Sequence, residues 1–169
     1  MLTETDLDHA IAFAATAHTG QRRKYTNEPY VTHCIEVMNI VRTAGGSIEM
    51  QCAAVLHDTI EDTYVSYSDL HIEFGENVAE MVLSLSDMEE GNRATRKRLS
   101  CERLAAASGN VQTIKLADLI SNTASITEHD PKFAAVYLKE KATLLRAMTK
   151  GNVALWNKAA KLIPDEYWP

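Results

Sequence analysis

The chain has 169 residues, of which 46% are hydrophobic, and a formal net charge of −6 at pH 7. The length fits one domain and the hydrophobic fraction excludes a mostly disordered chain, so residues 1–169 are expected to form a single domain. No apolar run reaches the roughly 20 residues that cross a bilayer. The acidic balance argues against non-specific binding of nucleic acid, so neither a membrane nor a nucleic acid is expected as a partner.

Helices are expected along the whole chain, because apolar residues recur at helical spacing and the sequence has only 7 glycines and 4 prolines. The first helix carries Leu7 and Ile11 on one face and ends near His18, where a polar loop begins. The predicted fold class is therefore all-α, with about eight helices. The expected helices after the first cover residues 30–43, 48–62, 68–73, 76–86, 94–107, 111–126, 131–149 and 153–161.

The cysteines and the N-terminus predict the compartment. Cys34, Cys52 and Cys101 are an odd number of thiols without CxxC spacing, which favours reduced cysteines. The N-terminal sequence MLTETDLDHA is acidic and lacks the basic start and apolar stretch of a signal peptide. A cytoplasmic protein is therefore expected.

The segment LHDTIEDT, residues 56–63, places one histidine and three carboxylates in a helix that otherwise reads as buried. Positions four apart lie above one another on a helix, so His57 is expected over Glu61 and Asp58 over Asp62. Burying these groups together is costly unless a cation lies among them. The pattern therefore indicates a cation-binding site.

Further ligands must come from other helices, and two residues have the required chemistry. His33 lies in PYVTHCIEV, and Asp118 lies in the very apolar segment IKLADLISNT. Two histidines and two aspartates form a mixed nitrogen and oxygen site that suits Mn²⁺, Fe²⁺ or Zn²⁺. The alternative interpretation is an Asp118 that pairs with Lys115 and a His33 on the surface of its helix. The other histidines, including His18, are interpreted as structural or exposed.

Two basic clusters stand out in the acidic chain. The first is Arg22-Arg23-Lys24, and the second comprises Arg93, Arg96, Lys97, Arg98 and Arg103. Such clusters serve a small anionic ligand or lie on solvated helix faces, and composition alone favours neither reading.

Five segments in order resemble the hydrolase domain of the RelA/SpoT alarmone enzymes, and the compact length resembles the stand-alone small alarmone hydrolases of the metazoan SpoT homologue type. The resemblance covers about residues 7–150. The segments are HTGQRRKYTNEPYVTH, AAVLHDTIEDT, FGENVAEMVLSLSD, RKRL and KLADLISN.

The resemblance implies an all-α HD-domain bundle around one metal site, with one Mn²⁺ per chain. It also implies a 3′-pyrophosphohydrolase that converts ppGpp or pppGpp to GDP or GTP and pyrophosphate. Glu61 and Asp62 match the pair that activates the attacking water. The implied metal ligands are His33, His57, Asp58 and Asp118, and the implied substrate contacts are Arg23, Lys24, Asn122 and, more loosely, Arg93 and Tyr137.

Two departures from the family pattern bear on the substrate. Cys34 follows His33 where the family usually has proline, and Leu119 follows Asp118 where it often has a basic residue. Because of the missing cation, another nucleotide, such as an adenosine alarmone or NADPH, stays an alternative substrate. A protein that only binds an alarmone, or an antitoxin-like protein, is the alternative from another functional class.

Overall fold

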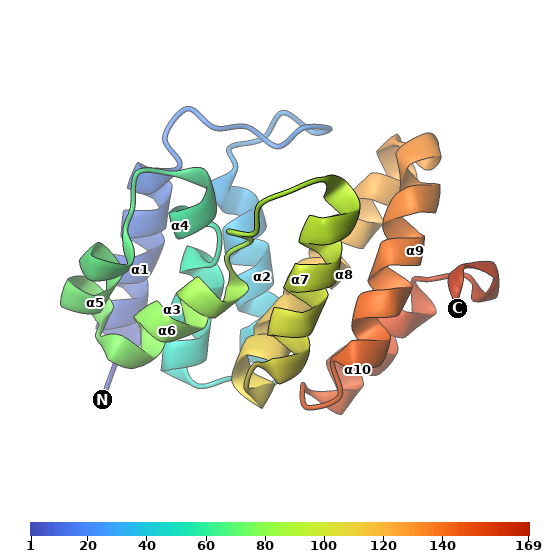
Figure 1. The fold of residues 1–169 in the computed structure, drawn as a ribbon. Coiled ribbons are helices and arrows are strands. Elements are labelled where there is room, and N and C mark those ends of the chain that lie inside the picture. Colours follow the sequence, from blue (N-terminus) through green and yellow to red (C-terminus); the bar gives the residue numbers. More distant parts are fainter. The chain divides into compact units, whose positions relative to one another are not determined.

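The computed structural model describes all residues from 1 to 169 and contains ten α-helices and one short 3-10 helix (Figure 1). The only β-type pairing is an isolated bridge between Arg22 and Pro29. The expected all-α fold class is therefore confirmed. None of the helices has both the length and the apolar character needed to cross a membrane.

The chain divides into two compact units, Met1–Ser86 and Asp87–Pro169. The expectation that residues 1–169 act as one domain stays a prediction. The first unit contains α1 (Glu4–Ala17), α2 (Val31–Thr43), α3 (Ile48–Leu56), α4 (Thr59–Asp62), α5 (Tyr67–Phe74) and α6 (Glu76–Leu85).

Helix α3 forms the centre of the first unit, because it packs against α1, α2 and α6. All its residues from Met50 to Leu56 are buried. The helix begins at a cap in which the Ser47 side chain accepts a hydrogen bond from the Met50 backbone N–H. An element buried on every side gives a rigid base for the residues that follow it.

The expected single helix over 48–62 is wrong, because the backbone breaks at His57 and Asp58 and restarts as α4. Two side chains form hydrogen bonds with backbone carbonyl groups at this break. The Nδ1 atom of His57 lies 2.7 Å from the Ala54 carbonyl oxygen, and the Thr59 hydroxyl donates to the Leu56 carbonyl oxygen at 2.7 Å. These bonds compete with the helical N–H donors and so favour the break.

The second unit contains α7 (Arg93–Ala106), α8 (Gly109–His129), α9 (Pro131–Ala147), α10 (Val153–Lys161) and the 3-10 helix η1 (Asp165–Tyr167). Helix α8 packs against α7, α9 and α10. It extends beyond the expected 111–126 at both ends. Its start is explained by the Ser108 side chain, which accepts a hydrogen bond from the Val111 backbone N–H.

Gln112 joins three parts of the second unit through one buried amide. Its Nε2 atom donates to the Leu104 carbonyl oxygen at 2.9 Å, and its Oε1 atom accepts from the Lys150 backbone N–H at 2.7 Å. The end of α7 and the loop before α10 are thereby tied to α8.

Replacing Gln112 with alanine is expected to lower the free energy of unfolding by about 2 kcal/mol, because buried backbone groups lose their partners. Urea unfolding measures the change. Asn157→Ala, at an exposed position of α10, is the control and is expected to change stability little. Equal stability of the two variants would contradict the assigned role of Gln112.

Candidate metal centre

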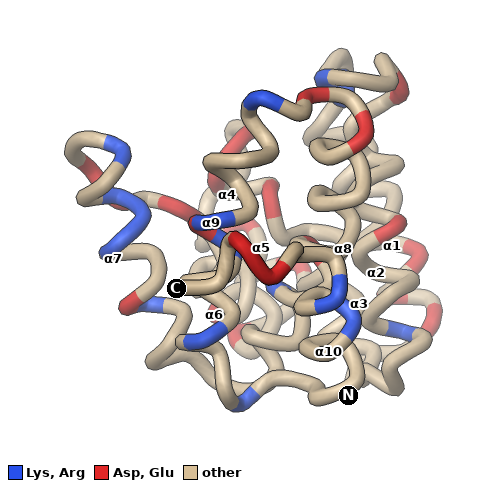
Figure 2. Tube along the Cα trace, turned by 90° about the vertical axis from the view of Figure 1, so that its right-hand side faces the viewer, with Lys and Arg blue, Asp and Glu red and all other residues tan.

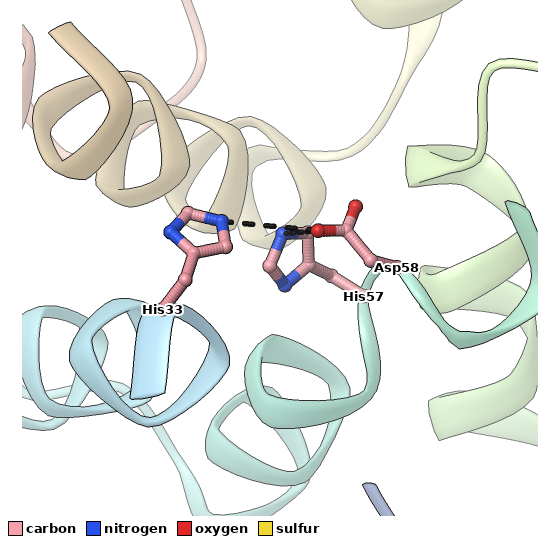
Figure 3. Close-up of side chains that lie close together, drawn as sticks. All are labelled: His33, His57 and Asp58. Carbon is pink, nitrogen blue, oxygen red and sulfur yellow. Dashed lines mark ion pairs between the residues drawn. The ribbon is translucent and has the colours of Figure 1, made fainter. Parts of the chain in front are cut away.

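Three ligand-type side chains converge in the first unit. Figure 3 shows His33 extending from α2 and His57 and Asp58 from the α3–α4 junction toward one another. Asp58 Oδ2 lies 3.0 Å from His57 Nε2 and 3.8 Å from His33 Nε2. The side chains of His33 and His57 are only 1% and 3% exposed, whereas that of Asp58 is 17% exposed. One ligand atom from each residue lies within 4.8 Å of the others, as around a metal ion.

The hydrogen bond of His57 determines which ring nitrogen faces the site. The Ala54 carbonyl oxygen only accepts hydrogen bonds, so Nδ1 of His57 carries a proton and donates. In neutral His57 the lone pair of Nε2 then faces the Asp58 carboxylate at 3.0 Å. Two lone pairs at this distance repel unless a proton or a cation lies between them. A histidine whose second nitrogen donates to a backbone carbonyl is the usual arrangement of a metal ligand, so the residues fit a divalent ion.

Tyr30 supports this group, although the sequence analysis assigned it no role. Its hydroxyl donates to Asp58 Oδ2 at 2.6 Å, and its ring lies 5.6 Å from that of His33. A short hydrogen bond to a carboxylate is strong and directional. Tyr30 therefore fixes the orientation of the Asp58 carboxylate. Its place in PYVTH, three residues before His33, was the available signal.

Glu61 and Asp62 lie on α4, and both are exposed. The Asp62 backbone N–H donates to the Asp58 carbonyl oxygen at 2.9 Å, so the expected one-turn spacing of these two residues is present. Although Asp62 is exposed, desolvation by the surrounding protein and the nearby charge of Asp58 raise the pKa of its carboxyl, and His18 and His57 partly offset this rise. The raised pKa makes Asp62 a stronger base than an ordinary aspartate.

His18 and Gln21 also lie beside this group. His18 is buried, its Nδ1 atom lies 2.8 Å from Gln21 Oε1, and its ring centre lies 5.0 Å from that of Tyr30. Gln21 Nε2 in turn donates to the Asp62 carbonyl oxygen at 2.8 Å. The two residues connect the loop after α1 to the end of α4. Their three-residue spacing in HTGQ is visible in the sequence, but the contact of Gln21 with Asp62 is not.

The predicted substrate contacts Arg23 and Lys24 lie in the loop between α1 and α2. Arg23 Nη1 forms an ion pair with Glu36 Oε2 at 3.2 Å. Lys24 is exposed, and its Nζ atom lies 4.9 Å from the ring centre of Tyr25. Both cationic side chains thus contact neighbouring residues of the first unit. That they bind a nucleotide stays a prediction.

The predicted site residues of the second unit include Asp118 and Asn122, which contact each other on α8. Asp118 is buried, and its Oδ1 atom accepts from Asn122 Nδ2 at 2.6 Å. Its Oδ2 atom accepts from Lys115 Nζ at 2.8 Å, which is the pairing that the sequence left open as an alternative. The role of Asp118 as a fourth ligand stays a prediction.

Arg93 and Tyr137 also belong to the second unit. Arg93 donates to both carboxylate oxygens of Glu140, at 2.8 and 2.9 Å, and lies 5.5 Å from the ring centre of Phe133. Tyr137 is buried, and burial raises the pKa of its hydroxyl. Their predicted contacts with substrate are not tested by these interactions.

Comparison with known proteins points to one family. The HD domain family matches residues 10–163. The chain is 36% identical to the guanosine-3′,5′-bis(diphosphate) 3′-pyrophosphohydrolase MESH1 of Drosophila melanogaster over 124 residues, which cover 72% of this chain and 69% of that protein. Its identity to MESH1 of Homo sapiens is 34% over 126 residues, which cover 73% and 70%.

Solved structures agree with this similarity. The structure of a metazoan ortholog of SpoT that hydrolyzes ppGpp matches with a TM-score of 0.87 and 28% identity, and the match covers 96% of each chain. A protein of Listeria monocytogenes EGD-e matches with a TM-score of 0.71 and 25% identity, over 83% of this chain and 96% of that one.

Replacing Tyr30 with phenylalanine is expected to weaken binding of Mn²⁺ by at least roughly tenfold, because Asp58 loses the hydrogen bond that orients it. Calorimetric titration with MnCl₂ measures the affinity. Tyr64→Phe, at an exposed position of the same unit, is the matched control. If both variants bind Mn²⁺ as tightly as the wild type, Tyr30 does not support a metal ligand.

Proposed function

The chain belongs to the HD-domain family, alongside the MESH1-type pyrophosphohydrolases, and we propose that it removes the 3′-pyrophosphate of ppGpp and pppGpp with the help of one Mn²⁺. The observation that carries this proposal is the convergence of His33, His57 and Asp58. Glu61 and Asp62 follow His57 and Asp58 by four residues, on the short helix α4. Relatives named for this reaction are 33–36% identical to the chain.

We propose His33, His57, Asp58 and Asp118 as the ligands of the ion. Asp118 can bind a metal without losing its present hydrogen bonds, because each carboxylate oxygen has more than one lone pair. Bound Mn²⁺ supplies a Lewis acid that neutralises the negative charge developing on the phosphorus oxygens. The two buried imidazoles of His33 and His57 would hold the ion with nitrogen ligands of little mobility.

Glu61 and Asp62 are proposed to move the protons of the reaction. Both side chains are exposed, so water and substrate can reach them. Asp62 lies one turn after the proposed ligand Asp58, and its carboxylate accepts the proton of the attacking water. Gln21 donates to the Asp62 carbonyl oxygen and so holds the backbone that carries this carboxylate.

The proposed substrate contacts are cationic, polar or aromatic, as a nucleotide with several phosphates requires. Cationic side chains neutralise the charge of the phosphates, and an amide side chain forms hydrogen bonds with the base or the sugar. An aromatic ring packs against the base or the sugar. To bind a phosphate of the substrate, Arg93 must give up its ion pair with Glu140. The proposed set is Arg23, Lys24, Asn122, Arg93 and Tyr137.

We also propose that the protein acts in the cytoplasm. Cys34, Cys52 and Cys101 are free thiols, and Cys34 and Cys52 are buried. Thiols persist in a reducing compartment such as the cytoplasm.

Replacing Asp62 with asparagine is expected to lower kcat for ppGpp roughly 100- to 10,000-fold, because the variant lacks the carboxylate that accepts the proton. Chromatography of nucleotides incubated with Mn²⁺-loaded protein measures GDP release. Asp8→Asn, at an exposed position of α1, is the control and is expected to keep full activity. An Asp62→Asn variant as active as this control would remove Asp62 from the mechanism.

Substrate competition separates the guanosine alarmone from other nucleotides, a question raised by Leu119. Leu119 is an uncharged residue, buried in α8, at a position where the family often has a cation. We expect kcat/KM for ppGpp to exceed that for the adenosine analogue and for NADPH by at least roughly tenfold. Equal or faster turnover of either competitor would contradict the guanosine assignment. Tight binding of ppGpp without turnover by Mn²⁺-loaded protein would favour an alarmone-binding protein instead.

A further inference from the structure

A second group of charged side chains lies in the second unit, around a cavity of about 340 Å³ lined by α7, α8 and α9. None of the residues proposed for catalysis, metal binding or substrate contact lines this cavity. Three lysines do so, one from each helix, and the basic stretch of α7 that supplies the first of them is drawn in blue in Figure 2. The lysines are Lys97, Lys115 and Lys141.

The carboxylates at this cavity are already neutralised by cations close to them. Glu140 accepts two hydrogen bonds from Arg93, at 2.8 and 2.9 Å. Glu102 lies 2.7 Å from Arg98 Nη1.

The remaining carboxylate, that of Asp87, is shared among several donors. Its Oδ1 atom lies 2.6 Å from Arg103 Nη2 and accepts from the Ser100 hydroxyl at 2.8 Å. Burial alone would raise the pKa of Asp87, but the charges of Lys115, Lys97 and Arg103 and the hydrogen bond from Ser100 hold it below its ordinary value. The single negative charge of Asp87 is therefore shared among more cations than it can neutralise.

The lysines, by contrast, are neutralised unequally. Lys115 donates to Asp118 at 2.8 Å, whereas Lys97 lies 3.7 Å from Asp87 Oδ2. Lys141 takes part in none of the ion pairs of the second unit, and its Nζ atom lies 5.0 Å from the ring centre of Tyr137. Burial and repulsion by Lys115 and Lys97 lower the pKa of Lys141 to about 8. The cavity therefore has a positive charge at Lys141 that no ion pair compensates, and one at Lys97 that is only partly compensated.

We propose that this cavity binds a small phosphate-bearing anion, with its phosphate between Lys97 and Lys141. A doubly charged oxyanion supplies the negative charge that the surrounding carboxylates do not provide, and ammonium groups are common ligands of phosphate. The volume exceeds what orthophosphate fills, and Leu144 and Cys101 line the cavity as apolar surface. This combination fits a phosphate monoester whose organic part contacts that surface.

The site is linked to the residues of the proposed reaction by two contacts within the second unit. Lys115 also donates to Asp118, and Glu140 also binds Arg93. An anion between Lys97 and Lys141 changes the charge beside Lys115 and Glu140, which line the same cavity.

Calorimetric titration of the full chain with phenyl phosphate, and separately with inorganic phosphate, tests the proposal. The wild type is expected to bind, and Lys141→Met and Lys97→Met are each expected to weaken binding by at least roughly tenfold. Lys139→Met, at an exposed position of α9, is the matched control and is expected to bind like the wild type. Methionine keeps most of the length of the side chain and removes a poorly compensated, half-buried charge, so Lys141→Met is expected to fold.

Tighter binding of phenyl phosphate than of inorganic phosphate supports a phosphate monoester as the ligand. Equal affinity supports the inorganic ion as the source of the same phosphate chemistry. The proposal is overturned if the wild type binds neither anion, or if both lysine variants bind as tightly as Lys139→Met. Thermal unfolding of each variant with and without phenyl phosphate provides the second readout, since only chains with the site intact are expected to gain stability.

Discussion

The first unit is organised around one close approach, that of His57 Nε2 to Asp58 Oδ2 at 3.0 Å. Because Nδ1 of His57 donates to a backbone carbonyl, the approach needs a positive charge between the two atoms. A proton on Nε2 would satisfy this pair alone. It would leave an imidazolium in a buried site next to His33, whose Nε2 atom lies 3.8 Å from the same carboxylate oxygen. A divalent cation uses the lone pairs of all three side chains, so it accounts for the whole group.

The break between α3 and α4 makes this group geometrically possible. Adjacent residues on a continuous helix project roughly 100° apart, so His57 and Asp58 would diverge. The break instead lets both side chains turn toward His33 (Figure 3). The buried helix α3 holds the near side of the break, and the link from Gln21 to Asp62 holds the far side. A short α4 anchored at both ends keeps its two exposed carboxylates at a defined distance from the ligands.

Helical periodicity was enough to predict the all-α fold, because it depends only on local spacing. The convergence of His33 with the His57-Asp58 pair was inferred from the chemistry of the residues and from the family resemblance, and the geometry brings these three together. Periodicity did not indicate the break at 57–58, since it arises from side chains bonding to backbone carbonyls. The burial of His18 and the contact of Tyr30 with Asp58 depend on how a loop folds over two helices, which no local pattern encodes. For Asp118, the pairing with Lys115 is present, and its metal-binding role rests on the family resemblance.

Electron spin echo spectroscopy of the protein loaded with one equivalent of Mn²⁺ tests the central claim most directly, because it detects nitrogen nuclei bound to the ion. The account predicts ¹⁴N modulation from two imidazole nitrogens, reduced to one in a His33→Asn variant that still folds. A spectrum without nitrogen modulation, like that of the hydrated ion, would contradict the claim that His33, His57 and Asp58 form a metal centre.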